Sequence, residues 1–182
     1  MFLRSGGFVL LRRTIMTDTD LTIRCAGKHD EEFVLAANEA NVEVLSPMDE
    51  GAFEMFLKSA EIFLAAEVSG KPAGFLIALR EGNRVYGSEN YRWFCKNRSE
   101  FIYIDRVVID GGFRGMKIGQ KLYSAVFDRA AETGVSCVTA EIDIIPYNEA
   151  SLKFHEAMGF HEAAQQYVRG GTVKVSLQEK KI

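Results

Sequence analysis

The chain has 182 residues, of which 47% are hydrophobic and 26% are charged, and its formal net charge is −3. This length and composition are typical of one globular domain with a sizeable core. The acidic balance and the lack of a basic block argue against nucleic acid or an anionic membrane surface as the main partner. No run approaches the roughly 18 apolar residues of a membrane-spanning helix.

The first twenty residues do not resemble a targeting segment. Arg12 and Arg13 interrupt the apolar stretch, and no small-residue cleavage site follows cleanly, so we expect no signal peptide. Met16 precedes the polar sequence TDTD and the first strand-like run. We therefore expect residues 1–20 to be an N-terminal extension, ordered or disordered, with Met16 as the working start. A native protein that begins at Met1 would refute that start. Residues 21–182 are then the functional domain.

Cysteine and histidine usage excludes two kinds of scaffold. Cys25, Cys95 and Cys137 are odd in number and share no CxxC spacing, which indicates free thiols in a reducing compartment and therefore a cytoplasmic protein. The three histidines show no metal-ligand spacing with the cysteines, so we expect no structural zinc.

Hydrophobic periodicity divides the domain into strands and helices. In chain order we expect a strand (21–25), a helix (30–45), a helix capped by Asp49, a hairpin (62–68 and 73–79), a strand (101–110), a helix (118–133), a strand (135–144), a helix (148–158) between Asn148 and Gly159, and two closing strands (160–168 and 172–177). This order predicts an α+β fold in three layers, α/β/α, with a central mixed sheet and about four helices.

Residues 81–100 fit neither pattern. They combine glycines and asparagines with the aromatic residues Tyr86, Tyr91, Trp93 and Phe94. A connection of this length is usually a functional loop or a lid. The alternative is an ordered loop whose aromatic side chains only cover the core, and the sequence leaves both open.

A glycine-bearing turn, GGFRGMKIGQ at residues 111–120, joins the strand at 101–110 to the helix at 118–133. The first N–H groups of a helix have no intrahelical partner and lie at the positive end of its dipole, so they bind phosphate. The segment therefore predicts an enzyme that holds a phosphate-bearing cofactor. Neither GxxxxGK[ST] nor GxGxxG is present, which argues against a nucleotide-binding enzyme.

This order, with this turn, resembles the GCN5-related N-acetyltransferase (GNAT) superfamily. The family's turn reads Gln/Arg-x-x-Gly-x-Gly/Ala; Arg114, Ile118 and Gly119 fit it, whereas Lys117 stands where the first glycine usually lies. If that position needs a positive φ, lysine costs roughly 1 kcal/mol. The resemblance implies a sheet whose fourth and fifth strands splay apart to admit the pantetheine arm of acetyl-CoA.

The resemblance also implies which residues hold acetyl-CoA as co-substrate, without a metal. N–H groups of the turn would cradle its pyrophosphate, and the preceding strand would pair with the pantetheine arm. The implied residues are Arg114, Gly115, Met116, Lys117, Ile118, Gly119 and Gln120 in the turn, and Val107, Val108 and Ile109 in the strand. For the strand residues, a plain core role is the alternative.

A second motif, NEASLKFHEAMGF at residues 148–160, resembles the family's Asn-x-x-Ala/Ser-x-x-x-Tyr-x-x-x-Gly-Phe signature. It implies that Asn148 contacts the pantetheine, besides capping its helix, and that Ser151 fills a small position there. His155 replaces the tyrosine that often protonates the departing thiolate. An imidazole can donate a proton near pH 7, so His155 is a candidate general acid; a buried structural histidine is the alternative.

The amine acceptor must lose a proton to a base. Asp105, in the middle of an apolar strand, is the first candidate, because a carboxylate there is costly unless it is paired or functional. Its neighbour Arg106 should point to the opposite face of a regular strand. Glu141 and Asp143 are second candidates, as base or as ligands of the amine; structural salt bridges are the alternative for all three. We expect Asp105→Asn to lower turnover and leave acetyl-CoA affinity intact.

A narrower resemblance is to a bacterial subgroup of acetyltransferases known mainly as predictions. It rests on NVEVLSPMD, SENYRWF, YIDRVVI and NEASLKFH. It implies that part of the aromatic segment forms the pocket wall and that polar residues of the first helical segment line the acceptor side. These residues are Asn90, Tyr91, Trp93 and Phe94, and Asn38, Asn41 and Glu43.

The sequence thus predicts a single-domain N-acetyltransferase that acts by direct attack in a ternary complex, since nothing pairs Cys137 with a base for a covalent route. The acceptor would be an amine of a small molecule or peptide, with no nucleic acid or membrane partner. A homodimer through the closing strands, at residues 160–177, stays open. A non-catalytic module that binds acyl-CoA or a metabolite is the alternative function, favoured by the departures at Lys117 and His155.

Overall fold

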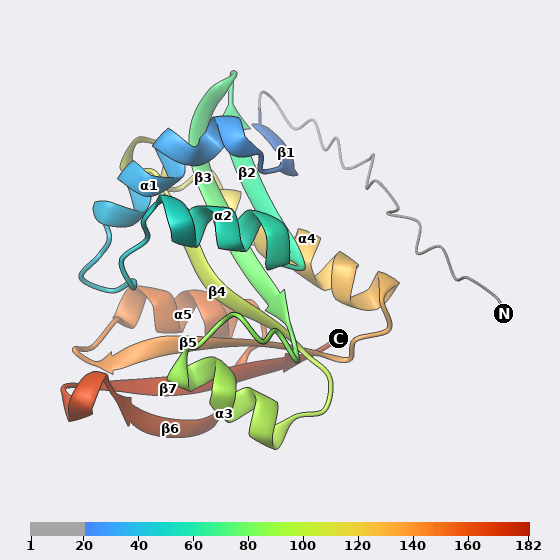
Figure 1. Ribbon diagram of the computed structural model, residues 1–182, viewed down its shortest axis with the longest axis vertical. Coiled ribbons are helices and arrows are strands. Elements are labelled where there is room, and N and C mark those ends of the chain that lie inside the picture. Colours follow the sequence, from blue (N-terminus) through green and yellow to red (C-terminus); the bar gives the residue numbers. More distant parts are fainter. Residues whose placement is uncertain (1–20) are drawn as a thin grey trace, which may run out of the picture.

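A computed structural model of the chain, which describes residues 21–182, is a seven-stranded sheet between two layers of helices (Figure 1). The strands are β1 (Leu21–Cys25), β2 (Ile62–Val68), β3 (Lys71–Arg80), β4 (Ile102–Ile109), β5 (Cys137–Ile145), β6 (His161–Val168) and β7 (Val173–Lys181), in the spatial order β1-β2-β3-β4-β5-β7-β6. The helices are α1 (Glu31–Glu39), α2 (Glu50–Ser59), α3 (Glu89–Asn97), α4 (Ile118–Glu132) and α5 (Glu149–Ala157). The predicted α+β fold with a mixed sheet is confirmed.

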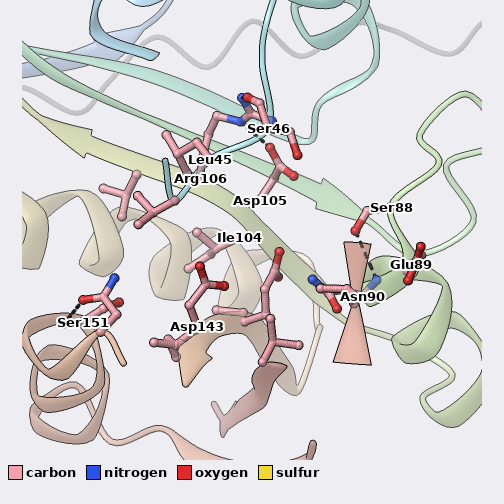
Figure 2. Close-up of a pocket in the computed structure, with 18 of the residues that line it drawn as sticks. Leu45, Ser46, Ser88, Glu89, Asn90, Ile104, Asp105, Arg106, Asp143 and Ser151 are labelled. Atoms are coloured by element: carbon pink, nitrogen blue, oxygen red, sulfur yellow. Dashed lines mark hydrogen bonds and ion pairs between the residues drawn. The ribbon is translucent and has the colours of Figure 1, made fainter. Parts of the chain in front are cut away.

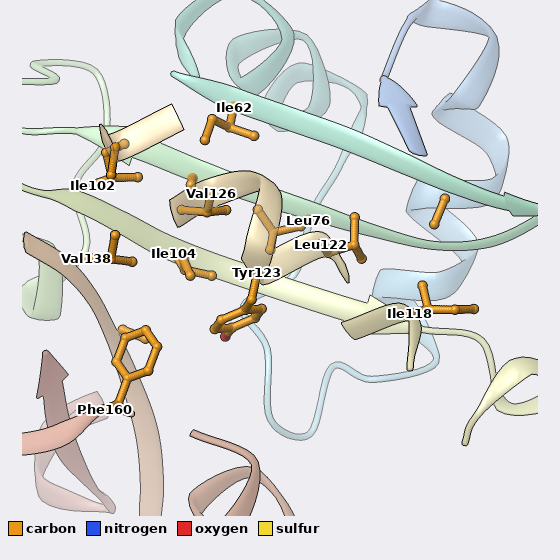
Figure 3. Close-up of a cluster of buried hydrophobic side chains, with 14 of the residues drawn as sticks. Ile62, Leu76, Ile102, Ile104, Ile118, Leu122, Tyr123, Val126, Val138 and Phe160 are labelled. Atoms are coloured by element: carbon orange, nitrogen blue, oxygen red, sulfur yellow. The ribbon is translucent and has the colours of Figure 1, made fainter. Parts of the chain in front are cut away.

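Each face of the sheet has its own core. Ile102 and Ile104 of β4 pack with α4, whereas Tyr103 and Val108 project from the opposite face and pack with the aromatic side chains of α2 and α3. Figure 3 shows the first of these cores, in which Tyr123 of α4 lies among aliphatic side chains and the ring of Phe160. The sheet therefore separates two sides of the molecule, which we call the α5 side (with α4) and the α3 side (with α1 and α2).

The sheet opens between β4 and β5. These two strands are parallel and pair only at Ile102–Val138 and Tyr103–Thr139, near their N-terminal ends; every other neighbouring pair is antiparallel. Beyond this point both strands have an edge that no neighbouring strand occupies. The predicted splay of the fourth and fifth strands is confirmed.

A β-bulge at Asp105 corrects one prediction. Ile77 pairs with Arg106 and Ala78 pairs with Ile104, so Asp105 is an extra residue in β4. The bulge breaks the alternation of side chains, and Asp105 and Arg106 both lie on the α3 side, with Arg106 Nε 2.5 Å from Asp105 Oδ2. The prediction that they point to opposite faces was wrong, because it assumed a regular strand.

The aromatic segment at 81–100 is not only a loop. It contains α3, whose N-cap Ser88 accepts from the N–H groups of Asn90 and Tyr91, so the described chain has five α-helices instead of about four. Tyr91 and Phe94 are buried in the core of the α3 side. The helix escaped prediction because its polar and aromatic residues have low helix propensity, and burial of the aromatic rings stabilises it instead.

Several local predictions hold, and one boundary differs. Asp49 and Asn148 cap α2 and α5 through their side chains, and Gly159 follows α5 with a φ of +86°. The helix expected at 30–45 ends at Glu39, and Val44 is exposed. Among residues 21–182, no helix is long and apolar enough to cross a membrane. The expectations for residues 1–20 lie outside the described residues.

Candidate active site

A cavity of about 410 Å³ passes between β4 and β5 where the strands part. Its walls come from both sides of the sheet, as Figure 2 shows for part of the lining. On the α3 side these include Tyr86, Ser88, Glu89, Asn90, Asp105, Arg106, Glu141 and Asp143, and on the α5 side Tyr123, Asn148, Ser151 and His155. Two reactants that approach from opposite sides of the sheet can therefore meet inside it.

The glycine-bearing turn lies before α4, and most of it is exposed. Gly115 has a φ of +82°, and Lys117, the N-cap of α4, has a φ of +58° in the left-handed region. The conformation that favours glycine is thus present at Lys117. Arg114 and Lys117 add two positive charges to the positive end of the helix dipole, which suits a phosphate group.

Lys117→Gly should stabilise the protein. Removing the Cβ from a left-handed residue relieves about 1–2 kcal/mol, and the extra freedom of glycine in the unfolded chain returns part of it. We expect a net gain of about 0.5–1 kcal/mol in the free energy of unfolding, measured in urea. Lys117→Ala, which removes the charge but keeps the strain, is the control. Equal stability of the two variants would show that strain is not the reason.

The strand residues predicted to pair with a cofactor arm lie at the open edge. Val107 pairs with Leu76 of β3 on one side, while β5 has already diverged on the other. Val107 also lines the cavity. The backbone of β4 beyond Tyr103 is therefore available for strand-like hydrogen bonds with an extended ligand.

On the α5 side, His155 is held from both ring nitrogens. Nδ1 lies 2.8 Å from the carbonyl oxygen of Ser151 and Nε2 lies 2.8 Å from the hydroxyl of Tyr123. A carbonyl only accepts, so Nδ1 carries the hydrogen; burial lowers the pKa of His155, so the ring is neutral and Nε2 accepts from Tyr123. Sequence reasoning missed Tyr123, whose signal was a tyrosine within the apolar pattern of its helix.

Glu141 has the most perturbed carboxyl in the cavity. Burial raises its pKa to about 8, against hydrogen bonds from Tyr103 and Asn90, and the nearby charge of Asp105 adds to the rise. Its Oε2 is buried without a hydrogen-bond partner. A carboxylate with a free oxygen and a pKa near neutrality is suited to accept a proton.

Both carboxylate oxygens of Asp105 are engaged by other side chains. It accepts a hydrogen bond from the hydroxyl of Tyr86 and pairs with Arg106. Arg106 also donates to Oδ1 of Asn38 at 2.6 Å and to the carbonyl oxygen of Ser46 at 3.1 Å. This network ties α1 and the chain after it to the bulge of β4. Both oxygens of Asp105 are therefore engaged, whereas Oε2 of Glu141 is free.

Some of the residues predicted to line the acceptor site lie at the cavity, and others lie away from it. Asn90 and Asp143 line the cavity; burial raises the pKa of Asp143, and its Oδ2 has no hydrogen-bond partner. Asn38 instead accepts a hydrogen bond from Arg106, and Asn41 donates one to the carbonyl oxygen of Ala37. The remaining predicted residues, Glu43, Tyr91, Trp93 and Phe94, are also outside the lining. Tyr86, Ser88 and Glu89, which sequence reasoning did not assign, take their place.

A family model described as "Acetyltransferase (GNAT) family" matches residues 28–160, most of the chain and all of this cavity apart from Val168, Arg169 and Val175. The chain belongs to the GNAT acetyltransferase family. It is therefore an acyltransferase, and the residues around the β4–β5 opening are its candidate active site. A search of the curated proteins gave no match.

Solved structures share this GNAT fold. The Salmonella typhimurium protein yncA, a putative acetyltransferase solved with its cofactor acetyl-CoA, is 20% identical, covers 89% of this chain and 94% of its own, and has a TM-score of 0.67. An N-acetyltransferase from Staphylococcus aureus Mu50 is 23% identical, with 89% and 98% coverage and a TM-score of 0.66. Arabidopsis thaliana Naa50, in complex with the bisubstrate analogue CoA-Ac-MVNAL, is 14% identical, with 90% and 99% coverage and a TM-score of 0.69.

Within residues 21–182, no group of three or more His, Cys, Asp and Glu is arranged to hold a metal ion. The cysteines at 25, 95 and 137 are free thiols. Burial raises the pKa of Cys137, which disfavours the thiolate that a covalent route would need.

Proposed function

We propose that this GNAT protein transfers the acetyl group of acetyl-CoA to a primary amine by direct attack in a ternary complex. The observation that carries the proposal is the cavity that crosses the sheet, with the phosphate-binding turn and the open edge of β4 beside it and Glu141 on its α3 side. The acetyl-CoA bound to the Salmonella relative and the bisubstrate analogue bound to the Arabidopsis relative support the choice of cofactor.

Acetyl-CoA would enter from the α5 side. The N–H groups of residues 115–120 and the charges of Arg114 and Lys117 receive the pyrophosphate, and the backbone of Val107–Ile109 receives the pantetheine arm. Asn148 has its Oδ1 engaged by the N–H of Ser151, which leaves its amide N–H₂ to contact that arm. The thioester then lies in the opening between β4 and β5.

The amine would enter from the α3 side, next to Glu141. The nitrogen forms a bond to the carbonyl carbon, its proton passes to the Glu141 carboxylate, and the C–S bond breaks. Glu141 must be ionised to take the proton, so with a pKa of about 8 the rate should rise as the pH rises through that value.

The departing thiolate collects a proton on the α5 side. Tyr123 and His155 line that part of the cavity and share a hydrogen bond. The hydroxyl proton of Tyr123 passes to the sulfur, and the tyrosinate that remains recovers a proton from solvent, while Nε2 of His155 holds the phenol oxygen in place through their hydrogen bond. We therefore propose the pair, rather than His155 alone, as the general acid. Cytoplasmic location and a homodimer stay predictions.

Calorimetric titration tests the cofactor. We expect saturable binding of acetyl-CoA and none of ATP or NAD, because the turn fits a CoA pyrophosphate and the open edge of β4 fits its pantetheine arm. Acetyl transfer to a panel of primary amines, followed by thiol release, tests the reaction. Binding without transfer to any amine would favour the non-catalytic module, and no binding of acetyl-CoA would overturn the proposed function.

A further inference from the structure

Two carboxylates on the α3 side of the cavity share one feature. Oε2 of Glu141 and Oδ2 of Asp143 are buried and have no hydrogen-bond partner. A buried carboxylate oxygen without a partner is costly, and burial is the main cause that raises the pKa of both groups. The protein thus presents two separate carboxylate oxygens that a ligand can contact.

The two groups are arranged along one strand. Glu141 and Asp143 are two residues apart on β5 and line the same cavity, so their side chains project from the same face and their Cα atoms are about 6.7 Å apart. A linear ligand that lies along β5 can meet both. Figure 2 shows Asp143 within the opening, below Ile104 and Asp105 of β4.

The charges around this part of the cavity are predominantly negative. Glu89, Asp105, Glu141 and Asp143 line it together with two cations, Arg106 and Arg169. Arg106 is already engaged by Asp105, Asn38 and Ser46. Arg169 is exposed; its charge opposes the rise in the pKa of Asp143, but Oδ2 stays unpartnered. A cationic hydrogen-bond donor from a ligand would therefore satisfy Oδ2 of Asp143, and also Oε2 of Glu141 once Glu141, whose pKa is about 8, is ionised.

We propose that the acceptor is a dicationic alkyl amine, whose reacting amine lies at Glu141 and whose second ammonium group pairs with Asp143. The inference rests on the proposed function, because it places the amine beside the thioester. An extended chain advances about 1.2 Å per bond, so a spacer of roughly four carbons between the two nitrogens matches the separation of the carboxylates. A monoamine, or a peptide N-terminus followed by a neutral amide, would leave Asp143 unpaired.

The test compares three compounds of similar length: 1,4-diaminobutane, n-pentylamine and 5-aminopentanoate. Calorimetry with each compound, in the presence of CoA, measures binding without turnover, and acetyl transfer measures kcat/KM. We expect the diamine to exceed n-pentylamine at least 10-fold in both and 5-aminopentanoate, whose second group is anionic, to be the poorest. Asp143→Asn should reduce the preference for the diamine over n-pentylamine at least 10-fold. Asp128→Asn, an exposed position of α4 outside the cavity lining, should keep it.

The two proposals fail in different ways. Transfer to n-pentylamine as fast as to 1,4-diaminobutane, or a preference that survives Asp143→Asn, would overturn the dicationic acceptor and leave the acetyltransferase intact. Equal binding of the three compounds would overturn it as well. Absence of acetyl-CoA binding would instead overturn the proposed function, and the dicationic acceptor with it.

Discussion

Glu141→Gln should lower kcat by about 10²- to 10⁴-fold, the usual contribution of a positioned general base. The amide keeps the size of the side chain and its hydrogen bond from Tyr103, but it cannot take the proton of the amine. Binding of acetyl-CoA should be unchanged, because Glu141 lies on the α3 side. Stopped assays of acetyl transfer between pH 6 and 9.5 measure the effect, and the rise in rate through about pH 8 should vanish in the variant.

The same substitution has an opposite effect on stability. A carboxyl whose pKa is raised in the folded state is harder to ionise there than in the unfolded chain, so ionisation favours unfolding. This penalty is absent below about pH 4.5, grows as the pH rises, and is complete above about pH 8. At pH 9 the free energy of unfolding of Glu141→Gln should therefore exceed that of the native protein by at least about 1 kcal/mol. At pH 4 the two free energies should be equal.

Glu149→Gln is the matched control. Glu149 is exposed on α5 and pairs with Lys153 at 2.9 Å, an arrangement that contributes little to stability. We expect its turnover and its pH dependence to follow the native protein. If Glu141→Gln kept the native kcat, a different group would be the base, and Asp105 would be the first to test.

Arg106→Met should destabilise the protein by about 3–5 kcal/mol, the usual cost of breaking a buried ion pair. The side chains of Arg106 and Asp105 are only 5% and 3% exposed, so the substitution leaves the buried carboxylate of Asp105 without its cation. Met keeps the contact with the ring of Phe56. Urea unfolding at pH 7 measures the loss. Because Arg106 also holds the carbonyl oxygen of Ser46, the KM for the amine should rise.

The double variant Asp105→Asn/Arg106→Met should recover part of the stability, since it removes both charges. Arg129→Met, which breaks a partly exposed pair with Glu61, should cost about 1 kcal/mol or less. A loss in Arg106→Met as small as that in Arg129→Met would contradict the role of the buried pair. The same pair complicates Asp105→Asn, whose turnover should be compared only after its folding has been measured.

The order of the elements, apart from α3, and the glycine-bearing turn could be predicted from the sequence, because their signals are local. Asp49 and Asn148 cap the helices that follow them, and hydrophobic periodicity marks each strand. The motifs at residues 114–119 and 148–160 were enough to indicate the GNAT fold and its splayed sheet. The sequence also pointed to the positive φ of Lys117, because this lysine stands where the family's turn motif usually has a glycine.

The chemistry inside the cavity depends on contacts between distant residues. The bulge that brings Asp105 and Arg106 together arises from the register of β4 against β3, and Arg106 reaches Asn38, 68 residues away. Tyr123 meets His155 only because α4 and α5 pack on one face. The rise in the pKa of Glu141 comes from burial, which no sequence window contains. The sequence by itself determined the fold and the position of the glycine-bearing turn, because both follow from local patterns. The tertiary structure decided which carboxylates are paired and which keep an oxygen without a partner, because burial and partners are properties of the assembled sheet.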